Sequence, residues 1–521
     1  MKPNHFTLAA VLVCLFLKLV PQNINAQFQN IYGSNANNYF IRVIPHGPDF
    51  YVLGEDNGQA TISRINQAGT WIWTRRLNIA SVWADGIVIP ASGNLLVVGY
   101  SLPFDNTNKS LIGEVTSNGT FICVKSLEGP GNEALNSIKL NPGGTFSAVG
   151  FHTIGGLRDV VIYNLSPGCT VNGKRQFFNF VNDDFGNDIE VLSGSGDFIV
   201  AGSLGNNGII YQMTSAGQFV SGAQGPSLFN YVDLAGTGNG DLLAAANSTS
   251  GNPPRLFRFD SGLFPIWEVA VNGLSALDQV IDGGNGNIYL VGTATINSLT
   301  RAVIVKMNDS GGPPVLDWAR YLENGESGYS GGALAVLPSG NLAFVDGRNG
   351  HPNSLGQSDA FMALTDGDLM SDCTLDAFVF LTFENTLFDG PLEPELFDSE
   401  FPIEMNLSGQ NLDYMTEEAC ASDPCTVDIV ITQNDSCGMV QICAVTTGPS
   451  PYSYQWCSSE STQCITAQLS CTPQTFCLTV TCADGSMATA TQTFSATDNI
   501  PPVALCVPGF GWNCLQAVTL L

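Results

Sequence analysis

The stretch Gly286–Thr295, GNIYLVGTAT, is a run of apolar, strand-forming residues held between glycines. Related stretches occur six more times, with starts about 44 to 54 residues apart: PDFYVLG from Pro48, GNLLVVG from Gly93, GTFSAVG from Gly144, GDFIVAG from Gly196, GDLLAAA from Gly240 and GNLAFVD from Gly340. A repeat of this length is typical of stacked or radial architectures.

Each copy lies among three other strand-like segments. An apolar strand such as DGIVIP (85–90) precedes it, and AVIVKMN (302–308) and an aromatic-led strand such as WIWTRRL (71–77) follow it. Four short antiparallel strands per repeat predict one propeller blade. The glycine-flanked strand should be the second of each blade, apolar throughout because neighbouring sheets cover both its faces. We expect its glycines where the chain turns sharply.

The two ends of the repeat region complement one another. FQNIYG (28–33) has the pattern of a fourth strand with no blade before it, and AFMALTDG (360–367) ends the seventh repeat without a fourth strand after it. Pairing of these segments would close a ring of seven blades and leave no open edge. The sequence therefore predicts an all-β chain: a seven-bladed β-propeller over 27–372, followed by a disulfide-rich Ig-like β-sandwich.

The repeat region also resembles a known group of proteins. The segment from Phe28 to Leu77, with its aromatic–glycine–Asn/Asp–strand rhythm and endings such as VLGE and VVGYS, is similar to the propeller repeats of secreted bacterial cell-surface proteins. The likeness covers the chain to about Asp372. It implies a propeller fold, which serves many functions.

The N-terminus has the features of an export signal over residues 1–26. Lys2 supplies a basic start, Phe6–Val20 an apolar stretch, and Ile24-Asn25-Ala26 a small-residue cleavage site. The apolar stretch is too short for a membrane-spanning helix. We therefore expect an extracellular or cell-surface protein with no transmembrane segment.

Cysteine usage agrees with export. The chain has 15 cysteines, and removal of Cys14 with the signal leaves an even number, which we expect to form disulfides. We expect Cys123 and Cys169 to bridge adjacent blades, and Cys373 and Cys420 to staple an acidic connector over 373–424. Further cysteines expected to be disulfide-bonded include Cys506 and Cys514. No histidine lies at a metal-ligand spacing from a cysteine.

Two further modules follow the connector. PYSYQW, CITAQL and FCLTVTC within 425–497 resemble the PKD-like and adhesin-type modules of bacterial surface proteins, which implies an Ig-like sandwich with Trp456 in its core. DNIPPVALC, at the start of 498–521, resembles the opening of a hyalin-like (HYR) repeat. We expect the natural product to continue with the rest of this repeat and a sorting domain. A short secreted form is the competing explanation.

The net charge of −28 is unevenly distributed, because no Lys or Arg follows Arg348. This charge pattern disfavours nucleic acids and acidic polysaccharides as partners of the C-terminal part. The acidic surface favours solubility, and a calcium-loaded surface is the alternative interpretation.

Two local motifs suggest chemistry that their context does not support. GYSGG (328–332) matches the nucleophile elbow G-x-S-x-G, but it lies in a loop with no helix after it. NDDFGND (182–188) is rich in oxygen ligands, but it lacks the spacing of a calcium-binding EF-hand loop. Turn formation by Asn and Asp side chains is the favoured explanation, and calcium binding the alternative.

One polar position recurs among the repeats. Eight residues before the repeat glycine stand Asp85, Asn136, Asp188 and Asp278, whereas the other repeats have Phe40, Val232 and Gly332. We expect this position at the start of the innermost strand, near one mouth of the central channel. Either each side chain bonds local backbone, or together they form a polar ring that binds a ligand or a cation.

These patterns favour a non-enzymatic surface protein used in binding or adhesion, with a glycan or protein ligand and no cofactor; calcium binding is the alternative. An extracellular carbohydrate-active enzyme, a hydrolase or lyase with its site at the propeller mouth, is one alternative, although no carboxylate pair is singled out by spacing. A structural spacer within a larger surface protein is another.

Overall fold

A computed structural model of the chain describes residues 28–34, 36–101, 107–128, 131–178, 183–192, 196–214, 218–322, 326–327, 332–349, 358–369, 374–383, 389–391, 395–398, 403–406, 409–412, 415–418, 426–434, 439–447, 452–469, 472–482 and 487–495. It forms two compact units, Met1–Cys420 and Ala421–Leu521, which we describe separately.

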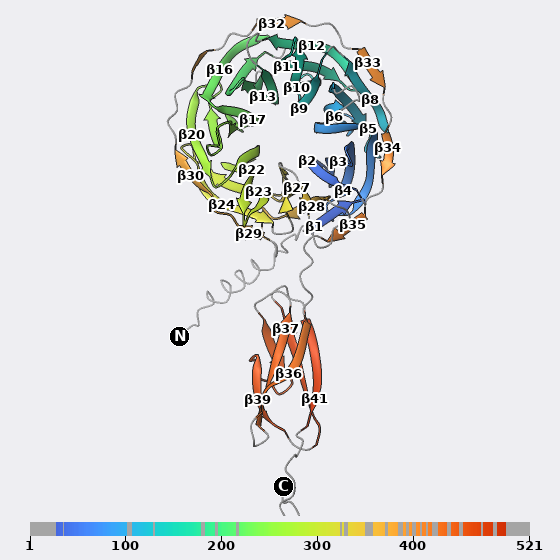
Figure 1. Cartoon of the computed structure of the whole chain (residues 1–521), viewed down its shortest axis with the longest axis vertical. Helices are drawn as coiled ribbons and strands as arrows, with labels where there is room; N and C mark the ends of the chain where they lie inside the picture. The colour runs from blue at the N-terminus through green and yellow to red at the C-terminus, as the bar shows by residue number, and fades with distance from the viewer. Residues whose placement is uncertain are drawn as a thin grey trace, which may run out of the picture. The chain divides into compact units, whose positions relative to one another are not determined.

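The first unit is a seven-bladed β-propeller, as predicted (Figure 1). Blade 1 contains β2 (Asn38–His46), β3 (Asp49–Asp56), β4 (Gln59–Asn66) and the start of β5 (Trp71–Val88). Blade 2 contains the end of β5, β6 (Leu95–Ser101), β7 (Lys109–Val115) and β8 (Phe121–Glu128). Blade 3 contains β9 (Glu133–Leu140), β10 (Phe146–Ile154), β11 (Leu157–Ser166) and β12 (Thr170–Phe178). Blade 4 contains β13 (Asp184–Val191), β14 (Phe198–Leu204), β15 (Asn207–Met213) and β16 (Phe219–Ser227).

The remaining blades follow the same order from the axis outwards. Blade 5 contains β17 (Phe229–Gly236), β18 (Leu242–Ser248), β19 (Arg255–Phe259) and β20 (Pro265–Asn272). Blade 6 contains β21 (Ala276–Gly284), β22 (Asn287–Ile296), β23 (Leu299–Asn308) and β24 (Val315–Leu322). Blade 7 contains β26 (Ala333–Val336), β27 (Leu342–Asn349), β28 (Ser358–Thr365) and β1 (Phe28–Gly33), with β25 (Glu326–Ser327) also on β27.

The N-terminal strand closes the ring. β1 pairs antiparallel with β28, with Phe28 opposite Leu364 and Tyr32 opposite Ala360. Ile31 and Tyr32 are fully buried, so the strand contributes apolar surface as well as a hydrogen-bonded ladder. The prediction that the first segment completes the last blade is confirmed.

Seven short strands after the last blade surround the propeller. These strands, which we call the belt, are β29 (Thr374–Asp376), β30 (Phe380–Phe383), β31 (Asp389–Pro391), β32 (Glu395–Asp398), β33 (Ile403–Asn406), β34 (Gly409–Leu412) and β35 (Met415–Glu418). In order they pair with the fourth strands of blades 6, 5, 4, 3, 2, 1 and 7 (Figure 1). The segment that we expected to be a connector therefore adds a fifth strand to every blade.

The apolar core is divided among the gaps between blades. Seven hydrophobic clusters lie in the described part of the propeller, one at each blade–blade interface. In β22 the side chains from Ile288 to Ala294 are buried regardless of their direction. The glycine-flanked strand is thus covered on both faces, as its uninterrupted apolar pattern predicted.

The two glycines of the repeat have different roles. The first lies in a turn with a positive φ, as in Gly286 (φ 80°). The second lies within a strand: a Cβ at Gly150 would be 1.8 Å from the Ala134 carbonyl oxygen, and one at Gly292 would be 2.4 Å from that of Ala276. Our expectation of a sharp turn at the second glycine is wrong, because a close approach of the innermost strand excludes a side chain there.

A disulfide joins blades 2 and 3. Cys123 in β8 and Cys169, in the turn before β12, are bonded, with their Cα atoms 6.1 Å apart. Cys169 is completely buried within the cluster between these blades. The bond adds a covalent link between outer parts of neighbouring sheets.

The second unit is a small β-sandwich. One sheet has the order β36 (Thr426–Asn434), β37 (Met439–Thr447) and β39 (Cys464–Gln468), and the other β38 (Ser453–Trp456), β40 (Gln474–Thr481) and β41 (Met487–Phe494). Trp456 is 1% exposed and packs in the core, as predicted. Disulfides join Cys443 to Cys464 and Cys457 to Cys477.

Several predicted features lie outside the described residues. They are the signal segment 1–26, most of GYSGG, the hyalin-like segment 498–521, and Cys373, Cys420, Cys506 and Cys514. Among the helices of the described part, none is long and apolar enough to cross a membrane.

We predict that the belt stabilises the propeller. A chain ending after residue 372 should have a free energy of unfolding lower by on the order of 5 kcal/mol than a chain ending after residue 420, because one backbone ladder is lost from each blade. The shorter chain should also aggregate, since its fourth strands become open edges. Denaturant titration and light scattering of both chains measure these effects. Equal stability would contradict this role of the belt.

The disulfide between blades gives a second prediction. The double variant Cys123→Ser/Cys169→Ser should be less stable by about 4 kcal/mol, because the bond closes a loop of 46 residues in the unfolded chain. Alkylation of the non-reduced wild-type protein followed by mass spectrometry is the direct check. An alkyl label on either cysteine would rule out the bond in solution.

Candidate functional site

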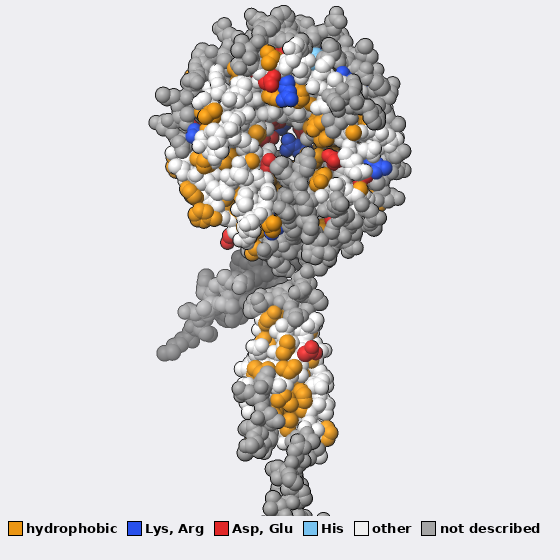
Figure 2. Space-filling model, in the orientation of Figure 1, with side chains coloured by type: hydrophobic (Ala, Val, Ile, Leu, Met, Phe, Trp, Pro, Cys, Tyr) orange, Lys and Arg blue, Asp and Glu red, His pale blue; other side chains and the backbone are white. Residues whose placement is uncertain are grey.

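A cavity of about 350 Å³ lies at the propeller axis, on the side where the innermost strands end. Figure 2 looks into a hollow at the centre of the ring, where basic and acidic side chains meet. Five carboxylates and two basic side chains line the cavity: Asp85, Asp188, Glu190, Asp233, Asp282, Arg42 and Lys139. Its size is within the range of small-molecule sites.

A β-bulge in each innermost strand of blades 1 to 6 sets the direction of these side chains. In β21, for example, the register shifts between Leu277 and Gln279, so Asp278 is the extra residue. The residue after the bulge points into the axial region in most blades: Arg42, Asp85, Asp188, Asp233 and Gln279 all line the cavity.

Our four predicted ring residues are therefore not equivalent. Asp85 and Asp188 follow the bulge, whereas Asn136 and Asp278 are the bulged residues. The turn after the innermost strand is one residue longer in blades 2 and 4, where Ile89 N–H bonds Asn94 O and Leu192 N–H bonds Asp197 O. Counting eight residues back from the repeat glycine therefore reaches the residue after the bulge in blades 2 and 4, but the bulged residue itself in blades 3 and 6. All four lie within the strands rather than at their start.

The residues that follow the bulges connect each blade to the next. Asp85 Oδ2 accepts from Ile138 N and Ser137 Oγ, each at 3.1 Å. Asp188 Oδ2 accepts from Leu234 N at 2.8 Å, and Asp233 Oδ2 from Val280 N at 2.8 Å. Gln279 Oε1 accepts from Leu334 N at 2.8 Å in the same way. One oxygen of each side chain therefore accepts a hydrogen bond from the next blade rather than from a loop of its own blade.

The bulged residues make a different set of contacts. Asn136 Nδ2 donates to Gly186 O at 2.8 Å, and Asn187 Nδ2 donates to Tyr231 O at 2.6 Å. Asp278 occupies the same position in blade 6, and its Oδ2 is buried without a hydrogen-bond partner. An ionised aspartate here cannot donate as asparagine does, and only the protonated carboxyl group has an O–H donor.

Arg42 is the central cation of the site. Its Nε lies 3.6 Å from Asp85 Oδ1, and its Nη2 lies 3.9 Å from Asp233 Oδ1, so it forms ion pairs without direct hydrogen bonds. Burial acts to lower the pKa of Arg42, but Asp85, Asp233, Asp188 and Asp278 together raise it. Lys139 pairs with Glu190 at 2.9 Å.

Three carboxyl groups around Arg42 are hard to ionise. Burial and the nearby Asp188 raise the pKa of Asp233 well above its usual range, although Arg42 opposes this. Burial likewise raises the pKa of Asp188. Burial and Asp346 raise the pKa of Asp278 to about 7. Excess negative charge at the axis is therefore only partly neutralised by Arg42 and Lys139.

The NDDFGND segment does not form one site among its described residues. Asp183 Oδ1 accepts from Arg158 N at 3.0 Å, Asn187 and Asp188 contact blade 5, and Asp184 is buried. Burial and nearby Asp159 raise the pKa of Asp184 to about 8. No group of three His, Cys, Asp or Glu residues in the described part of the chain is placed to hold a metal ion.

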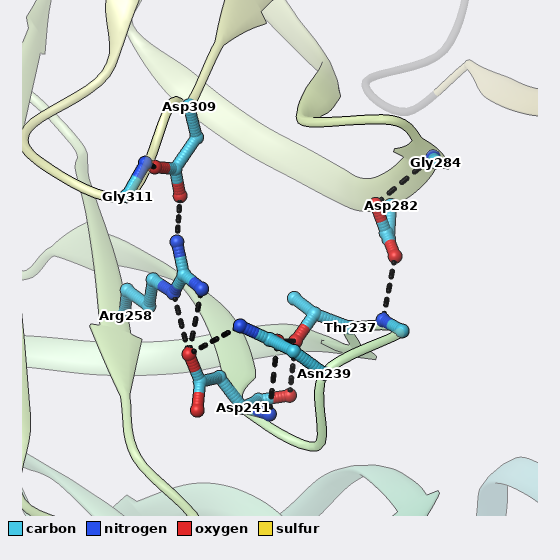
Figure 3. Close-up of polar contacts among 9 residues, drawn as sticks. Thr237, Asn239, Asp241, Arg258, Asp282, Gly284, Asp309 and Gly311 are labelled. Carbon is cyan, nitrogen blue, oxygen red and sulfur yellow. Dashed lines mark hydrogen bonds and ion pairs between the residues drawn. The ribbon is translucent and has the colours of Figure 1, made fainter.

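A second cavity, of about 360 Å³, lies between the turns of blades 5 and 6 and adjoins the first at Asp282. Figure 3 shows its polar contacts: Arg258 reaches both Asp241 and Asp309, with Nη2 to Asp241 Oδ2 at 2.6 Å. Asp282 accepts from Gly238 N at 3.1 Å and Gly284 N at 3.0 Å. These carboxylates fix the turns, so we assign this cavity a structural role.

Sequence reasoning missed Arg42, Lys139, Asp233 and Gln279. For Arg42 and Gln279 the second glycine of the repeat carried the missing signal, because it lies opposite the residue before the bulge: Gly54 pairs with Phe40 and Gly292 with Leu277. Blade 5 has Ala246 at this position and Gly150 of blade 3 pairs with Leu135, so the signal does not find Asp233 or Lys139. In blades 1, 2 and 6 the cavity residue is two positions further along the innermost strand. That relation depends on strand register, which the linear spacing does not show.

Comparison with known proteins gives only weak likenesses. No protein-family model and no curated protein matches the chain. Among solved structures, a protein of unknown function from Bacteroides caccae has a TM-score of 0.36 at 13% identity, covering 56% of this chain and 94% of its own. The polysaccharide lyase Uly1 has a TM-score of 0.41 at 8% identity, covering 64% and 90%. A structure described as NanB plus Optactamide has a TM-score of 0.40 at 11% identity, covering 68% and 72%.

The raised pKa of Asp278 predicts a pH dependence of stability. The folded chain keeps its proton up to about pH 7, whereas an ordinary aspartate loses it near 3.8, so stability should fall as pH rises between these values. Each pKa unit corresponds to about 1.4 kcal/mol. Asp278→Asn should flatten this part of the profile, measured by denaturant titration from pH 4 to pH 8.

The exposed Asp317 provides the matched control for that profile. Asp317→Asn should keep the wild-type slope. An unchanged slope in Asp278→Asn would show that Asp278 ionises normally in the folded protein.

Proposed function

We propose that the chain is an exported binding protein whose propeller holds its ligand in the axial cavity. The observation that carries the proposal is that the two oxygens of a cavity carboxylate have different contacts. Oδ2 of Asp85 and Oδ2 of Asp233 accept backbone N–H groups of the next blade, while Oδ1 of each faces Arg42 beyond hydrogen-bond distance. These outer oxygens are available to a ligand without loss of the bonds between blades.

Export is supported by the disulfides. Three of them join pairs of described cysteines, at Cys123–Cys169, Cys443–Cys464 and Cys457–Cys477, and Cys482 is also disulfide-bonded. Such bonds persist in oxidising compartments outside the cytosol. Together with the N-terminal signal pattern they favour a secreted or surface-held protein, with a glycan or a protein as the ligand class.

A binding screen of the full chain tests the proposal. Labelled wild-type protein is applied to a glycan array and to immobilised extracellular proteins, in parallel with Asp85→Asn/Asp233→Asn. Asparagine retains an oxygen acceptor for the backbone N–H groups, so this variant should fold, which a melting curve verifies. Hits that weaken by roughly tenfold or more in the variant support the axial site. Ligands that bind both proteins equally would place the site elsewhere.

A carbohydrate-active enzyme is the second candidate, favoured by one observation. Asp188 and Asp233 in the cavity and Asp278, which acts on Arg42, all have raised pKa values, and perturbed carboxyl groups concentrate at catalytic sites. Incubation of the full chain with a panel of polysaccharides, followed by detection of new reducing ends or unsaturated products, separates the candidates. Turnover that disappears in Asp233→Asn would establish the enzyme.

A further inference from the structure

We infer that the axial cavity binds an organic cation, an ammonium or guanidinium group, on the outer oxygens of Asp85 and Asp233. This inference rests on the proposed function and names the chemistry of its ligand. The two oxygens belong to blades 2 and 5, and each lies within 4 Å of the Arg42 guanidinium. A small donor group at this point has carboxylate acceptors from two blades.

The charge of the cavity favours a positive ligand. Lys139 and Glu190 form an ion pair, and Asp282 is satisfied by two backbone N–H groups. Arg42 and Lys139 together face Asp85, Asp188, Asp233 and Glu190, so the carboxyl groups outnumber the basic side chains. A further positive charge would reduce the repulsion between these carboxylates, whereas an anion would add to it.

Arg42 shows that the ring accommodates a guanidinium group. Its side chain is 22% exposed, with Nε 3.6 Å from Asp85 Oδ1 and Nη2 3.9 Å from Asp233 Oδ1. These distances exceed those of a direct hydrogen bond, so each carboxylate retains capacity for a donor. A ligand cation would therefore compete with Arg42 only in part.

The anchoring of the carboxylates favours an organic cation over a metal ion. Asp85, Asp188 and Asp233 are each held by a backbone N–H group of the following blade. No three acidic side chains in the described residues converge as metal ligands. Hydrogen-bond donors on a carbon skeleton can reach separated carboxylates, which a single ion cannot. The net charge of −28 would also draw cations towards the protein.

Protonation should compete with the ligand. Burial raises the pKa values of Asp188 and Asp233, and burial and Asp346 raise that of Asp278 to about 7. The negative charge around Arg42 therefore develops at a higher pH than it would on exposed aspartates, and affinity for a cation should increase from pH 5 to pH 8. Affinity for an anion would change in the opposite direction.

Calorimetric titration of the full chain tests the inference with defined probes. Agmatine represents a free amine and guanidine, the tripeptide Gly-Lys-Gly a protein side chain, and glucose and glucuronate the neutral and anionic controls. We expect at least one cationic probe to bind, more tightly at pH 8 than at pH 5. Asp233→Asn and Asp85→Asn should each weaken it by roughly tenfold, and Arg42→Met should strengthen it, because the internal competitor is removed. Asp317→Asn should leave binding unchanged.

The outcomes separate this inference from the proposed function. Binding of glucose or a glycan that depends on Asp233, without binding of either cation, would overturn the inference and leave the binding function intact. Binding of glucuronate that becomes tighter at low pH would likewise overturn the inference and leave the binding function intact. Cation binding that is insensitive to Asp85, Asp233 and Arg42 would also overturn it. If neither the probes nor the screened glycans and proteins bind in a way that depends on the cavity residues, both the inference and the proposed function fail.

Discussion

The close approach of the innermost and second strands is the constraint on which the rest of the propeller depends. In five blades the second glycine of the repeat lies where a Cβ would meet a backbone carbonyl, at 1.6 Å in the case of Gly202 and Phe185. That carbonyl belongs to the segment that bulges in the innermost strand. The bulge adds one residue and reverses the direction of those that follow. Without it, the side chains that now reach the axis would point between the blades.

Two consequences follow from the bulge. The polar side chains after it lie within reach of the next blade, so Asp85, Asp188, Asp233 and Gln279 each accept a backbone N–H group across an interface. They also bring several carboxylates close to one axis, where burial and the nearby Asp188 raise the pKa of Asp233 and Arg42 is the central counter-charge. The same residues thus hold adjacent blades together and create the charged cavity that we propose as the binding site.

The rim of the propeller is secured by different means. Blade 7 is completed by the first strand of the chain, and every fourth strand is covered by a short strand of the belt. The belt strands pair with blades 6 to 1 in descending order and finally with blade 7. A segment of fewer than fifty residues therefore contacts the whole circumference of the propeller. Because its strands are three or four residues long, it replaces seven long open edges with short ones. The Cys123–Cys169 disulfide adds a covalent link between two blades.

The sequence by itself determined the number of blades, the order of their strands, the closure by Phe28–Gly33 and the burial of Trp456. Each of these follows from local pattern: apolar runs, turn residues and an unmatched strand at either end. The tertiary structure alone decided where the 374–418 segment lies, because strands of three or four residues carry too little pattern to show their partners. It also decided which side chains reach the axis. Asp85 and Asn136 stand at the same distance from their repeat glycine, but a turn longer by one residue puts the first beyond the bulge and the second within it. Side-chain direction in a strand reverses with each residue, so spacing along the chain could suggest a polar ring but could not determine its members.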